Sequence, residues 1–266
     1  MPEYTLRISE TELTRYKMMA ALAAASEAGP WAEAGFVPGA RVVDIGCGPA
    51  AVLVELARRV APGGTVTGVD QSAESLDVAR QVIAEAGVDN AEVRQGDAAA
   101  TGLPEGEADV VNIRHVLAHN APEVAAAIVA HARSLLKPGG RLYLVDSDGS
   151  AFRSERPLDP DLEDLMDRYW QMLADKGCER LAGPRLGAYA EDAGLEVVAR
   201  YPRIDAIPLL PGLRPPAWAA RQAMLDSGHC TDDDVARWEA AFERNDAAGA
   251  ANVLFGPMYV VVARNP

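Results

Sequence analysis

The stretch VVDIGCGPAAV, from Val42 to Val52, decides the fold of this chain. An apolar run reaches the acid Asp44, turns at Gly46 and Gly48, and restarts as a helix-forming sequence. A strand that enters a helix through a glycine turn brings free backbone N–H groups to one point, and open α/β sheets bind their ligands at such turns. The turn is therefore the first place to look for a binding site.

Composition limits the classes of protein to which the chain can belong. Of its 266 residues, 49% are hydrophobic and 24% are charged, so it can bury a sizeable core, as one large α/β domain or as a core that carries a lid. The formal net charge is −14 and no basic patch is visible. An acidic surface repels phosphate backbones, so we expect no nucleic-acid partner.

Cysteine usage and hydropathy indicate the compartment. The three cysteines are widely spaced and form no CxxC pair, which predicts neither a zinc site nor a disulfide framework. The segment MMAALAAASEAG resembles a signal peptide, but Glu27 interrupts it and charged residues precede it, which favours a soluble helix. No other segment is long and apolar enough to span a bilayer. We predict a cytoplasmic protein that does not bind membranes.

Helix and strand signals alternate along the first 150 residues. Ser9 and Glu12 have capping-box spacing, which predicts a helix from there to about Gly29. The expected strands are residues 41–45, 65–70, 91–96, 108–113 and 140–146. The expected helices between them are residues 50–60, 73–86 and 121–136, of which the last ends at the turn KPGG. Strands that alternate with helices form βαβ units, and hence a parallel sheet with helices on both faces.

Beyond Asp146 the pattern changes to charged helices and two late strands. The helices are expected at residues 160–176, 184–193, 215–227 and 232–245, and the strands at residues 195–204 and 253–264. We predict one α/β domain over residues 1–266: a Rossmann-like, doubly wound sheet of seven strands, mostly parallel with an antiparallel last strand, plus a helical lid. Its expected parts are a helical cover (1–35), a cofactor-binding core (36–150) and substrate lid insertions (150–182 and 207–250).

Two cofactor classes would accept the glycine turn. GCGPAA fits the pattern GxGxxA, and Asp70 follows about 20 residues later, which is the fingerprint of dinucleotide binding and of a nicotinamide oxidoreductase. Asp44 argues against that cofactor, because its carboxylate would repel a diphosphate and attract a cationic ligand. Asp97 can accept a hydrogen bond from an adenine amino group, with the N–H of Ala98 donating to the ring. No Tyr-x-x-x-Lys pair for hydride chemistry is present.

Five ordered segments carry a resemblance to a known family. They are VVDIGCGPA (42–50), VTGVDQS (66–72), VRQGDA (93–98), ADVVNIRHVLAHN (108–120) and LLKPGGRLYLVD (135–146). Together they resemble the class I S-adenosylmethionine-dependent methyltransferases, of the type similar to the ubiquinone/menaquinone-biosynthesis enzymes, over roughly residues 40–150. The resemblance implies S-adenosylmethionine as cofactor and methyl transfer to a small molecule.

The resemblance also assigns the main cofactor contacts. The residues that would hold the methionine moiety lie in and before the glycine turn: Asp44, Gly46, Cys47 and Gly48. Asp70 would bind the ribose, and Asp97 with Ala98 would bind the adenine. An alternative for Asp97 is that it only caps a turn.

Three further cofactor contacts lie outside the glycine turn. Gln71 would flank the adenine, unless it is simply solvated. The carbonyl of Asn112, at the end of the fourth strand, would accept from the cofactor's amino group. Tyr16, with Arg15, would close over the cofactor carboxylate from the N-terminal helix, although Tyr16 could equally pack in the core.

The segment NIRHVLAHNAPE supplies candidate catalytic bases. Asn120 begins a helix-capping pattern, so the residues before it form a turn near the cofactor's reactive end. His115 and His119 lie on this turn and could take a proton from a hydroxyl acceptor. Enzymes of this type often read R-x-V-L-H-H here, and Ala118 replaces the first histidine of that pair. The alternative for each histidine is a purely structural role.

Large apolar side chains in the otherwise charged lid predict an apolar acceptor pocket. Tyr169, Trp170 and Trp218 are candidate substrate contacts, and His229 lies beside them in the lid. The alternative is that the aromatic residues anchor the lid to the core. The pocket would suit a ring or a polyketide- or terpenoid-like molecule.

These observations predict a methyltransferase that acts on a small, largely apolar metabolite of secondary metabolism, with oxygen favoured slightly over carbon or nitrogen. The alternatives are a nicotinamide-dependent oxidoreductase and a protein that binds the cofactor without transferring its methyl group in natural-product biosynthesis. Asp146 and Asp148 lack the Asp-Asn partner of metal-dependent enzymes, so we expect them to shape a turn and expect no metal. The expected partner is the small-molecule acceptor, and a homodimer is left open.

Overall fold

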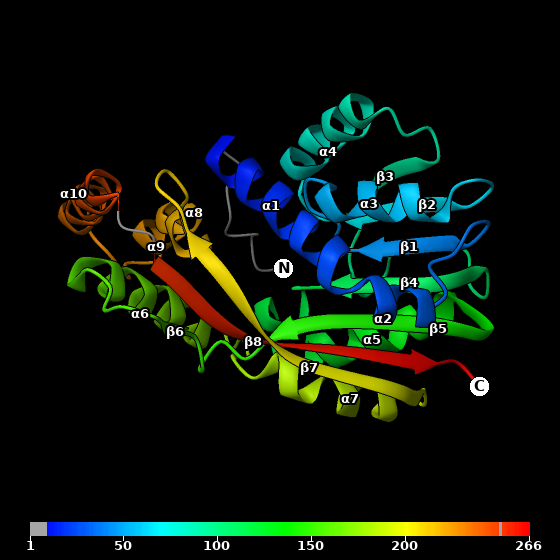
Figure 1. The fold of residues 1–266 in the computed structure, drawn as a ribbon. Coiled ribbons are helices and arrows are strands. Elements are labelled where there is room, and N and C mark those ends of the chain that lie inside the picture. Colours follow the sequence, from blue (N-terminus) through cyan, green and yellow to red (C-terminus); the bar gives the residue numbers. More distant parts are fainter. Residues whose placement is uncertain (1–9, 250–251) are drawn as a thin grey trace.

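Eight strands form one sheet in the part of the chain that the computed structural model describes, residues 10–249 and 252–266. They are β1 (Arg41–Ile45), β2 (Thr65–Asp70), β3 (Ala91–Gln95), β4 (Ala108–Arg114), β5 (Leu136–Ser147), β6 (Arg153–Ser154), β7 (Glu196–Leu209) and β8 (Asn252–Arg264). Their order is β3-β2-β1-β4-β5-β8, and β7 and β6 both pair with β8 (Figure 1).

Strand directions confirm the predicted class of fold. β1 to β5 run parallel, and β8 runs antiparallel to β5. The predicted count of seven strands is one short, because the two-residue β6 pairs with Leu254 and Phe255 of β8. β8 extends past the end of β5, and β6 satisfies backbone groups that this overhang would leave unpaired. β5 also starts earlier than expected, at Leu136, with an irregular register through the KPGG turn.

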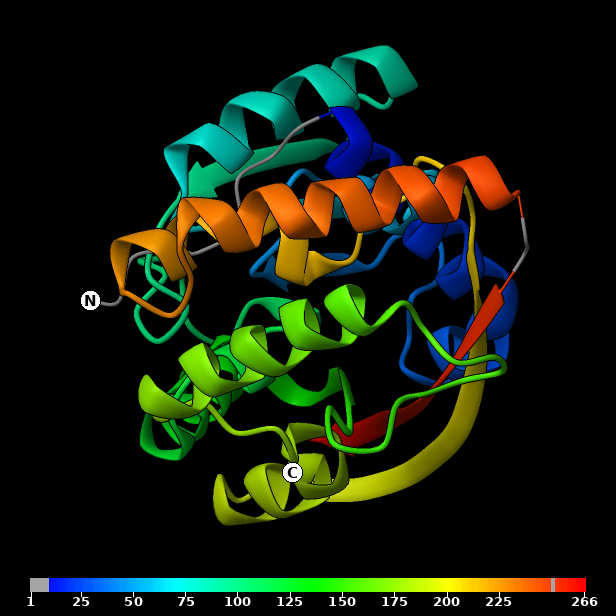
Figure 2. The same ribbon diagram turned by 90° about the vertical axis from the view of Figure 1, so that its left-hand side faces the viewer.

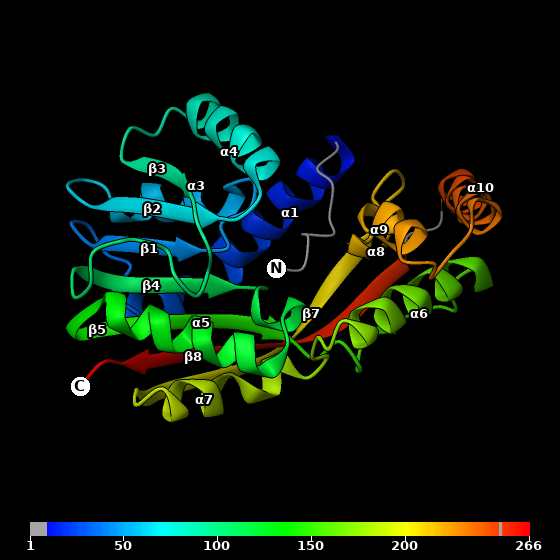
Figure 3. The same cartoon turned by 180° about the vertical axis from the view of Figure 1, so that it is seen from behind.

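Helices cover both faces of the sheet (Figures 1 and 3). One face packs against α3 (Ala51–Val60) and α4 (Ala73–Ala86), and the other against α5 (Pro122–Leu135) and α7 (Ala182–Asp192). The strands between them are apolar on both sides, as a sheet buried on both faces requires. No helix in the described residues combines the length and apolar character needed to cross a bilayer.

The order of the strands reverses at β1, which lies between β2 and β4. The carboxyl ends of these strands, at Ile45, Asp70 and Arg114, therefore meet at one edge of the sheet. That edge faces the lid in Figures 1 and 3. Ligands of open α/β sheets bind at such a switch point, so the fold directs attention to the loops that follow these three strands.

The N-terminal cover is made of two helices, α1 (Glu10–Ser26) and α2 (Ala28–Glu33). The prediction of one helix up to Gly29 is therefore wrong. The helix is interrupted at Glu27, whose side chain is fully buried and bound by residues of the sheet. The predicted cap, Ser9, lies outside the described residues.

A two-stranded ribbon connects the sheet to the lid. β7 and β8 pair from Glu196 with Arg264 to Leu209 with Asn252, whereas β5 pairs with β8 only as far as Met258. Beyond Met258 the ribbon continues away from the main sheet and reaches the lid helices (Figure 1).

The lid has a hydrophobic core of its own. Its helices are α6 (Pro160–Asp175), α8 (Pro216–Ala219), α9 (Arg221–Asp226) and α10 (Asp232–Ala248), and α6 and α10 lie side by side across the end of the molecule (Figure 2). The buried side chains between them include Leu165, Met172, Met224, Trp238 and Phe242. The single helix predicted at residues 215–227 is wrong, because Ala220, with φ −84° and ψ −2°, separates α8 from α9.

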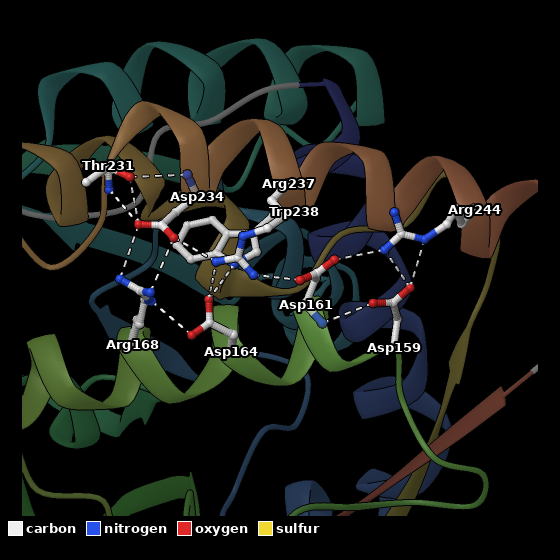
Figure 4. Close-up of polar contacts among 9 residues, drawn as sticks. All are labelled: Asp159, Asp161, Asp164, Arg168, Thr231, Asp234, Arg237, Trp238 and Arg244. Carbon is white, nitrogen blue, oxygen red and sulfur yellow. Dashed lines mark hydrogen bonds and ion pairs between the residues drawn. The ribbon is translucent and has the colours of Figure 1, made fainter.

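Ion pairs join the two long lid helices (Figure 4). On α10, Arg237 binds Asp161 at 2.6 Å and Asp164 at 3.0 Å. Arg244, two turns further along, binds Asp159 at 2.8 Å. The indole nitrogen of Trp238 donates to Asp164 at 3.0 Å, so the polar network continues directly into the apolar core of the lid.

Candidate functional site

The loop between β1 and α3 favours glycine at two positions. Gly46 and Gly48 have φ of 73° and 51°, in the left-handed region that favours glycine. A methyl group on Gly46 would also lie 2.3 Å from Cγ2 of Val116. The N–H groups of Gly46 and Cys47 donate to the carbonyl of Val69 at 2.7 and 3.2 Å. These contacts hold the bare backbone of the loop at the end of β2.

Asp70, the last residue of β2, fastens the same loop. One carboxylate oxygen accepts from the N–H of Gly48 and the other from the N–H of Ser72, both at 2.9 Å. Burial raises the pKa of Asp70, although these backbone donors oppose the shift. The carboxylate lies beside the glycine turn, where the resemblance requires the ribose-binding acid.

Asp44 and Asn112 form a buried pair on the neighbouring strands β1 and β4. The amide nitrogen of Asn112 lies 2.6 Å from Oδ1 of Asp44. Burial raises the pKa of Asp44 to about 7, and the nearby charge of Asp70 adds to this effect. Asn112 was expected at the end of the fourth strand, but β4 continues to Arg114. The structure brings its side chain, bound to Asp44, to the site.

The thiol of Cys47 faces the core beneath the loop. A methyl group on Gly68 of β2 would lie 2.8 Å from its sulfur atom. Burial raises the pKa of Cys47 well above its ordinary value, and the charges of Asp44 and Asp70 act in the same direction. The thiol therefore stays protonated, and Cys47 can serve a ligand only through its backbone.

The turn after β3 brings Asp97 to the same edge of the sheet. Oδ1 of Asp97 accepts from the N–H of Ala99 at 2.7 Å, so the residue does cap a turn, and Ala98 packs beside the core. The N–H of Gly96 donates to the carbonyl of Asp70, which fixes this turn next to the end of β2. Gln71 is exposed there, and its carbonyl accepts from the side chain of Gln95 at 3.0 Å.

The cover helix α1 lies over the glycine loop. A methyl group on Gly48 would lie 4.0 Å from the ring of Tyr16. The guanidinium of Arg15 stacks on that ring, 4.7 Å from its centroid. Arg15 is also close enough to His119 and Tyr169 for its charge to influence the pKa of both. The cover, the turn that carries the candidate bases His115 and His119, and the lid helix α6 therefore converge on one region.

His115 follows β4 directly and has an uncommon backbone conformation. Its φ is 54°, in the left-handed region that non-glycine residues rarely adopt and that often marks functional sites. Its Nδ1 atom lies 3.7 Å from the buried carboxylate of Asp146, which is beyond a hydrogen bond but within range of an ion pair when the ring is protonated. Its Nε2 atom is buried and has no hydrogen-bond partner among the described residues.

Asp146 was expected only to shape a turn, and the structure gives it a larger part. Its Oδ2 atom accepts from the N–H of Ala118 at 3.0 Å, which holds the short 3-10 helix η1 (Leu117–His119). Asp146 is therefore a carboxylate that lies close to both candidate bases, a position that was not predicted from the sequence. The sequence signal that could have revealed this position is that Asp146 lies near the end of β5, the strand that pairs with β4, and His115 directly follows β4.

His119 lies on η1, half-buried. Burial lowers its pKa, and the charges of His115 and Arg15 act in the same direction, while Asp146 opposes them. The ring is therefore neutral near pH 7, as a base requires. The predicted cap at Asn120 is wrong: α5 begins at Pro122 after Ala121, and the side chain of Asn120 instead donates to the carbonyl of Val116 at 2.8 Å.

The aromatic residues predicted to line a pocket mainly build the lid. Tyr169 is buried in the lid core, with Trp170 packed 5.3 Å from it, ring to ring. Trp218 packs edge-on against the ring of Phe242. His229 is bound by Ser227 and Asp175 at 2.8 and 3.0 Å. Tyr169 is also close enough to Arg15 and Tyr16 of α1 for their charges to influence its pKa.

Metal ligands were not expected. Within residues 10–249 and 252–266, no group of three or more histidine, cysteine or acidic side chains could hold a metal ion. Asp148 accepts from the N–H and the hydroxyl of Ser150, which is the turn that was predicted for it. Independence from metal stays a prediction.

Curated relatives of the chain include named methyltransferases. It is 40% identical over 107 residues to nocamycin O-methyltransferase of Saccharothrix syringae, covering 40% of this chain and 38% of the relative. It is 35% identical over 109 residues to demethylmenaquinone methyltransferase of Listeria monocytogenes, covering 41% and 45%. An uncharacterised 37.1 kDa protein in transposon Tn4556 of Streptomyces fradiae is 34% identical over 166 residues, covering 62% and 46%. The chain thus spans less than half the length of these relatives.

Solved structures share the fold over nearly the whole chain. A Bacillus halodurans C-125 protein, provisionally named a methyltransferase, has a TM-score of 0.60 at 21% identity, covering 91% of this chain and 99% of that one. The cyclase SpnF has a TM-score of 0.56 at 17% identity, covering 100% and 87%. A family model described as a methyltransferase domain matches residues 36–193, which is more than half of the chain and includes the glycine loop, Asp70 and both candidate bases. The chain therefore belongs to the class I S-adenosylmethionine-dependent methyltransferases.

Proposed function

We propose that this protein transfers a methyl group from S-adenosylmethionine to a small, largely apolar acceptor, with a hydroxyl oxygen as the favoured acceptor atom. The observation that carries the proposal is that Nε2 of His115 is buried and has no hydrogen-bond partner among the described residues. The other ring nitrogen lies near the buried carboxylate of Asp146. A buried nitrogen with no hydrogen-bond partner is unfavourable unless a ligand supplies one. A hydroxyl group that presents its proton to this atom would supply the partner.

The residues around the glycine loop fit the cofactor. Gly46 and Gly48 carry no side chain at two positions where one would collide or be strained, so a ligand could approach the backbone of the loop closely. Asp44 offers a buried carboxylate to a positively charged amino group, and Asp70 offers acceptors to ribose hydroxyls. When bound, the cofactor supplies an electrophilic methyl group on a positively charged sulfur. The chain's own task is to align the acceptor in a site from which water is excluded, which can account for much of the rate of such displacements.

A base would complete the chemistry for a hydroxyl acceptor. The ring of His115 would take the proton at Nε2 while the carboxylate of Asp146, 3.7 Å from Nδ1, stabilises the charge that develops on the ring. Asp146 is held by the N–H groups of Ala118 and Ser147, so it would not need to move. His119, kept neutral by burial, is the second candidate.

Support for an oxygen acceptor comes from two sources. One is the base-and-carboxylate arrangement, which suits an acceptor that must lose a proton as the methyl group arrives, as a hydroxyl group does. The other is the resemblance to an enzyme named as an O-methyltransferase of nocamycin. The relative named demethylmenaquinone methyltransferase is matched over a similar share of the chain, so the acceptor atom has to be decided by experiment.

Two measurements test the proposal. S-adenosylhomocysteine should raise the melting temperature of the protein, whereas NAD should not. Incubation with S-adenosylmethionine and a panel of phenolic, polyketide and terpenoid alcohols should give products that are heavier by one methyl group, with release of S-adenosylhomocysteine. A product formed without any gain in mass would instead favour cofactor binding without transfer, and stabilisation by NAD alone would overturn the cofactor assignment.

A further inference from the structure

A buried carboxylate lies where the cover, the sheet and the lid ribbon meet. Glu27, at the joint between α1 and α2, has no exposed surface. Its Oε1 atom accepts from Nη1 of Arg114 and from Nη2 of Arg203, both at 2.7 Å. Its Oε2 atom accepts from Nη1 of Arg114 at 2.9 Å and from the hydroxyl of Tyr143 at 2.8 Å. Donors from three different strands thus bind one side chain of the cover.

The charges at this point balance. Burial by itself would raise the pKa of Glu27, but Arg114 and Arg203 outweigh it and lower the pKa. Arg203 also binds Asp205 at 2.6 Å, so two guanidinium groups face two carboxylates. A buried charge that loses its partner is strongly unfavourable. The contacts of Glu27 are therefore expected to persist through any movement of the parts that they join.

Arg114 links the carboxylate to the candidate site. It is the last residue of β4 and directly precedes His115, which has a left-handed backbone conformation and begins the turn that carries both candidate bases. Its charge also acts on the buried carboxylate of Asp44. Through Arg114, Glu27 fixes the point at which β4 leaves the sheet and the candidate base begins.

Arg203 links the carboxylate to the root of the lid ribbon. It pairs in register with Met258, and Met258 pairs with Ser147 of β5 on the other side. This is the last rung at which β8 is held by β5, and beyond it the ribbon runs on to the lid (Figure 1). The bond between Arg203 and Glu27 therefore joins the root of the ribbon to the joint of the cover.

We propose that Glu27 is a positioning residue of the methyl-transfer site, which couples the cover helix α1 and the lid ribbon to the end of β4. Cover and lid meet beside the candidate site: Tyr16 lies next to the glycine loop, and Tyr169 is close enough to Arg15 and Tyr16 for their charges to influence its pKa. A shift of α1 on cofactor binding moves the α1–α2 joint, and the carboxylate passes this shift to Arg203 and the ribbon. The inference rests on the proposed function, since it assumes that the cofactor binds beneath α1.

Variants of Arg203 test the coupling without touching the candidate site. Arg203→Met removes the link to the ribbon and leaves Glu27 bound by Arg114 and Tyr143. Arg203→Lys keeps a cation at the position. Arg200→Met is the matched control, because Arg200 lies on β7 like Arg203 but forms its 2.7 Å ion pair with Glu191 of α7, where both side chains are exposed. The affinity for S-adenosylhomocysteine is measured by calorimetry, and amide hydrogen exchange is followed in α1 and α6 with and without this ligand.

In the wild type and in Arg200→Met, the ligand should slow exchange in both α1 and α6. In Arg203→Met it should still bind within about threefold of the wild-type affinity and protect α1, but the protection of α6 should fall by about fivefold or more. Arg203→Lys should recover most of that protection. If Arg203→Met does not fold, Arg203→Gln, a neutral donor, should show the same loss to a smaller degree.

Two results would overturn the coupling: wild-type protection of α6 in Arg203→Met, or ligand binding that protects α1 alone in the wild type. A wild-type protein that does not bind S-adenosylhomocysteine at all would overturn the proposed function first and this inference with it. The binding measurement therefore separates the two failures.

Discussion

The side-chain amide of Asn112 donates to the carboxylate of Asp44 across 2.6 Å, and this bond joins the two central strands of the sheet, β1 and β4, beside the point where the strand order reverses. Both side chains are buried. β1 leads into the glycine loop, and β4 leads into the turn that carries His115 and His119. The bond between Asp44 and Asn112 therefore links the candidate cofactor site to the candidate bases.

The pH dependence of cofactor binding should reveal Asp44. Burial raises its pKa to about 7, so the carboxyl group is mostly neutral at pH 6 and mostly ionised at pH 8. A ligand with a positively charged amino group favours the ionised form, and its affinity should therefore rise with pH, by about tenfold between pH 6 and pH 8. Calorimetry with S-adenosylhomocysteine measures this. Asp44→Asn, which cannot titrate, should give a flat profile, and an equally flat wild-type profile would refute the assignment.

Removal of the Asp70 carboxylate should weaken cofactor binding. Asp70→Ala should cost about 1.5–3 kcal/mol of binding free energy, the range for hydrogen bonds to a charged group. The variant also loses the bond to the N–H of Gly48, so the loop that faces the cofactor should loosen. Asp77→Ala, an exposed acid paired with Arg80 on α4, serves as control and should bind as the wild type does. Unchanged affinity in a folded Asp70→Ala would remove Asp70 from the cofactor site.

Replacement of the true base should lower turnover with little effect on the cofactor. We favour His115 over His119, because its Nε2 atom lacks a partner among the described residues and its Nδ1 atom lies near Asp146. His115→Ala should lower the rate by about 10²–10⁴-fold while the affinity for S-adenosylhomocysteine stays constant. His131→Gln is the control histidine variant, because His131 lies in the C-terminal half of α5 and bonds to Thr101 rather than to the candidate bases. Rates within about threefold of wild type for both His115→Ala and His119→Ala would mean that the acceptor arrives ionised or is a carbon or nitrogen nucleophile.

The ion pairs between α6 and α10 should make the lid sensitive to acid. Hydrogen bonding to Arg237 lowers the pKa of Asp234 to about 2, and Arg237 and Arg244 lower that of Asp161 (Figure 4). Carboxylates with lowered pKa stabilise the fold above their unfolded pKa, near 4, and lose this contribution as the pH falls toward 2. The protection factors of α6 and α10, which are the intrinsic exchange rates at each pH divided by the observed rates, should therefore fall across that window before those of the core sheet do.

A variant isolates the contribution of the central arginine. Arg237→Met removes three of these pairs and should speed exchange in α10 by about threefold to tenfold at pH 7, less so in high salt, because exposed pairs are weak individually and screened by ions. Arg58→Met, which removes a single exposed pair with Glu55 on α3, should leave the lid unchanged. An Arg237→Met lid that exchanges as in the wild type would show that the apolar core alone holds α6 to α10.

Local patterns in the sequence were sufficient for most strands and helices of the central sheet and for the grouping of several residues of the candidate cofactor site. Apolar runs and glycine turns placed β1 and β2 at their observed bounds, and the capping residue Ser72 and the left-handed Gly87 bracket α4 where the pattern ended. Gly46, Asp44 and Asp70 lie close together because the ends of adjacent parallel strands meet wherever such a sheet forms. Local pattern and tertiary fold agree at these positions.

The tertiary structure decided everything that depends on partners far apart in the chain. Glu27 looked like a charge that interrupts an apolar helix, yet it binds Arg114 and Arg203, which lie 87 and 176 residues away. Asn120 had the residue type and spacing of a helix cap, but its amide found the carbonyl of Val116 instead. Tyr169, Trp170 and Trp218 were predicted to line an acceptor pocket, and the fold packs them in or against the lid's own core, where burying their area stabilises the lid helices. Their contact with an acceptor stays a prediction. The spacing of residues along the chain indicates which conformation a segment prefers. Which distant charged, polar and aromatic side chains become partners depends on burial, and burial exists only once the elements have packed.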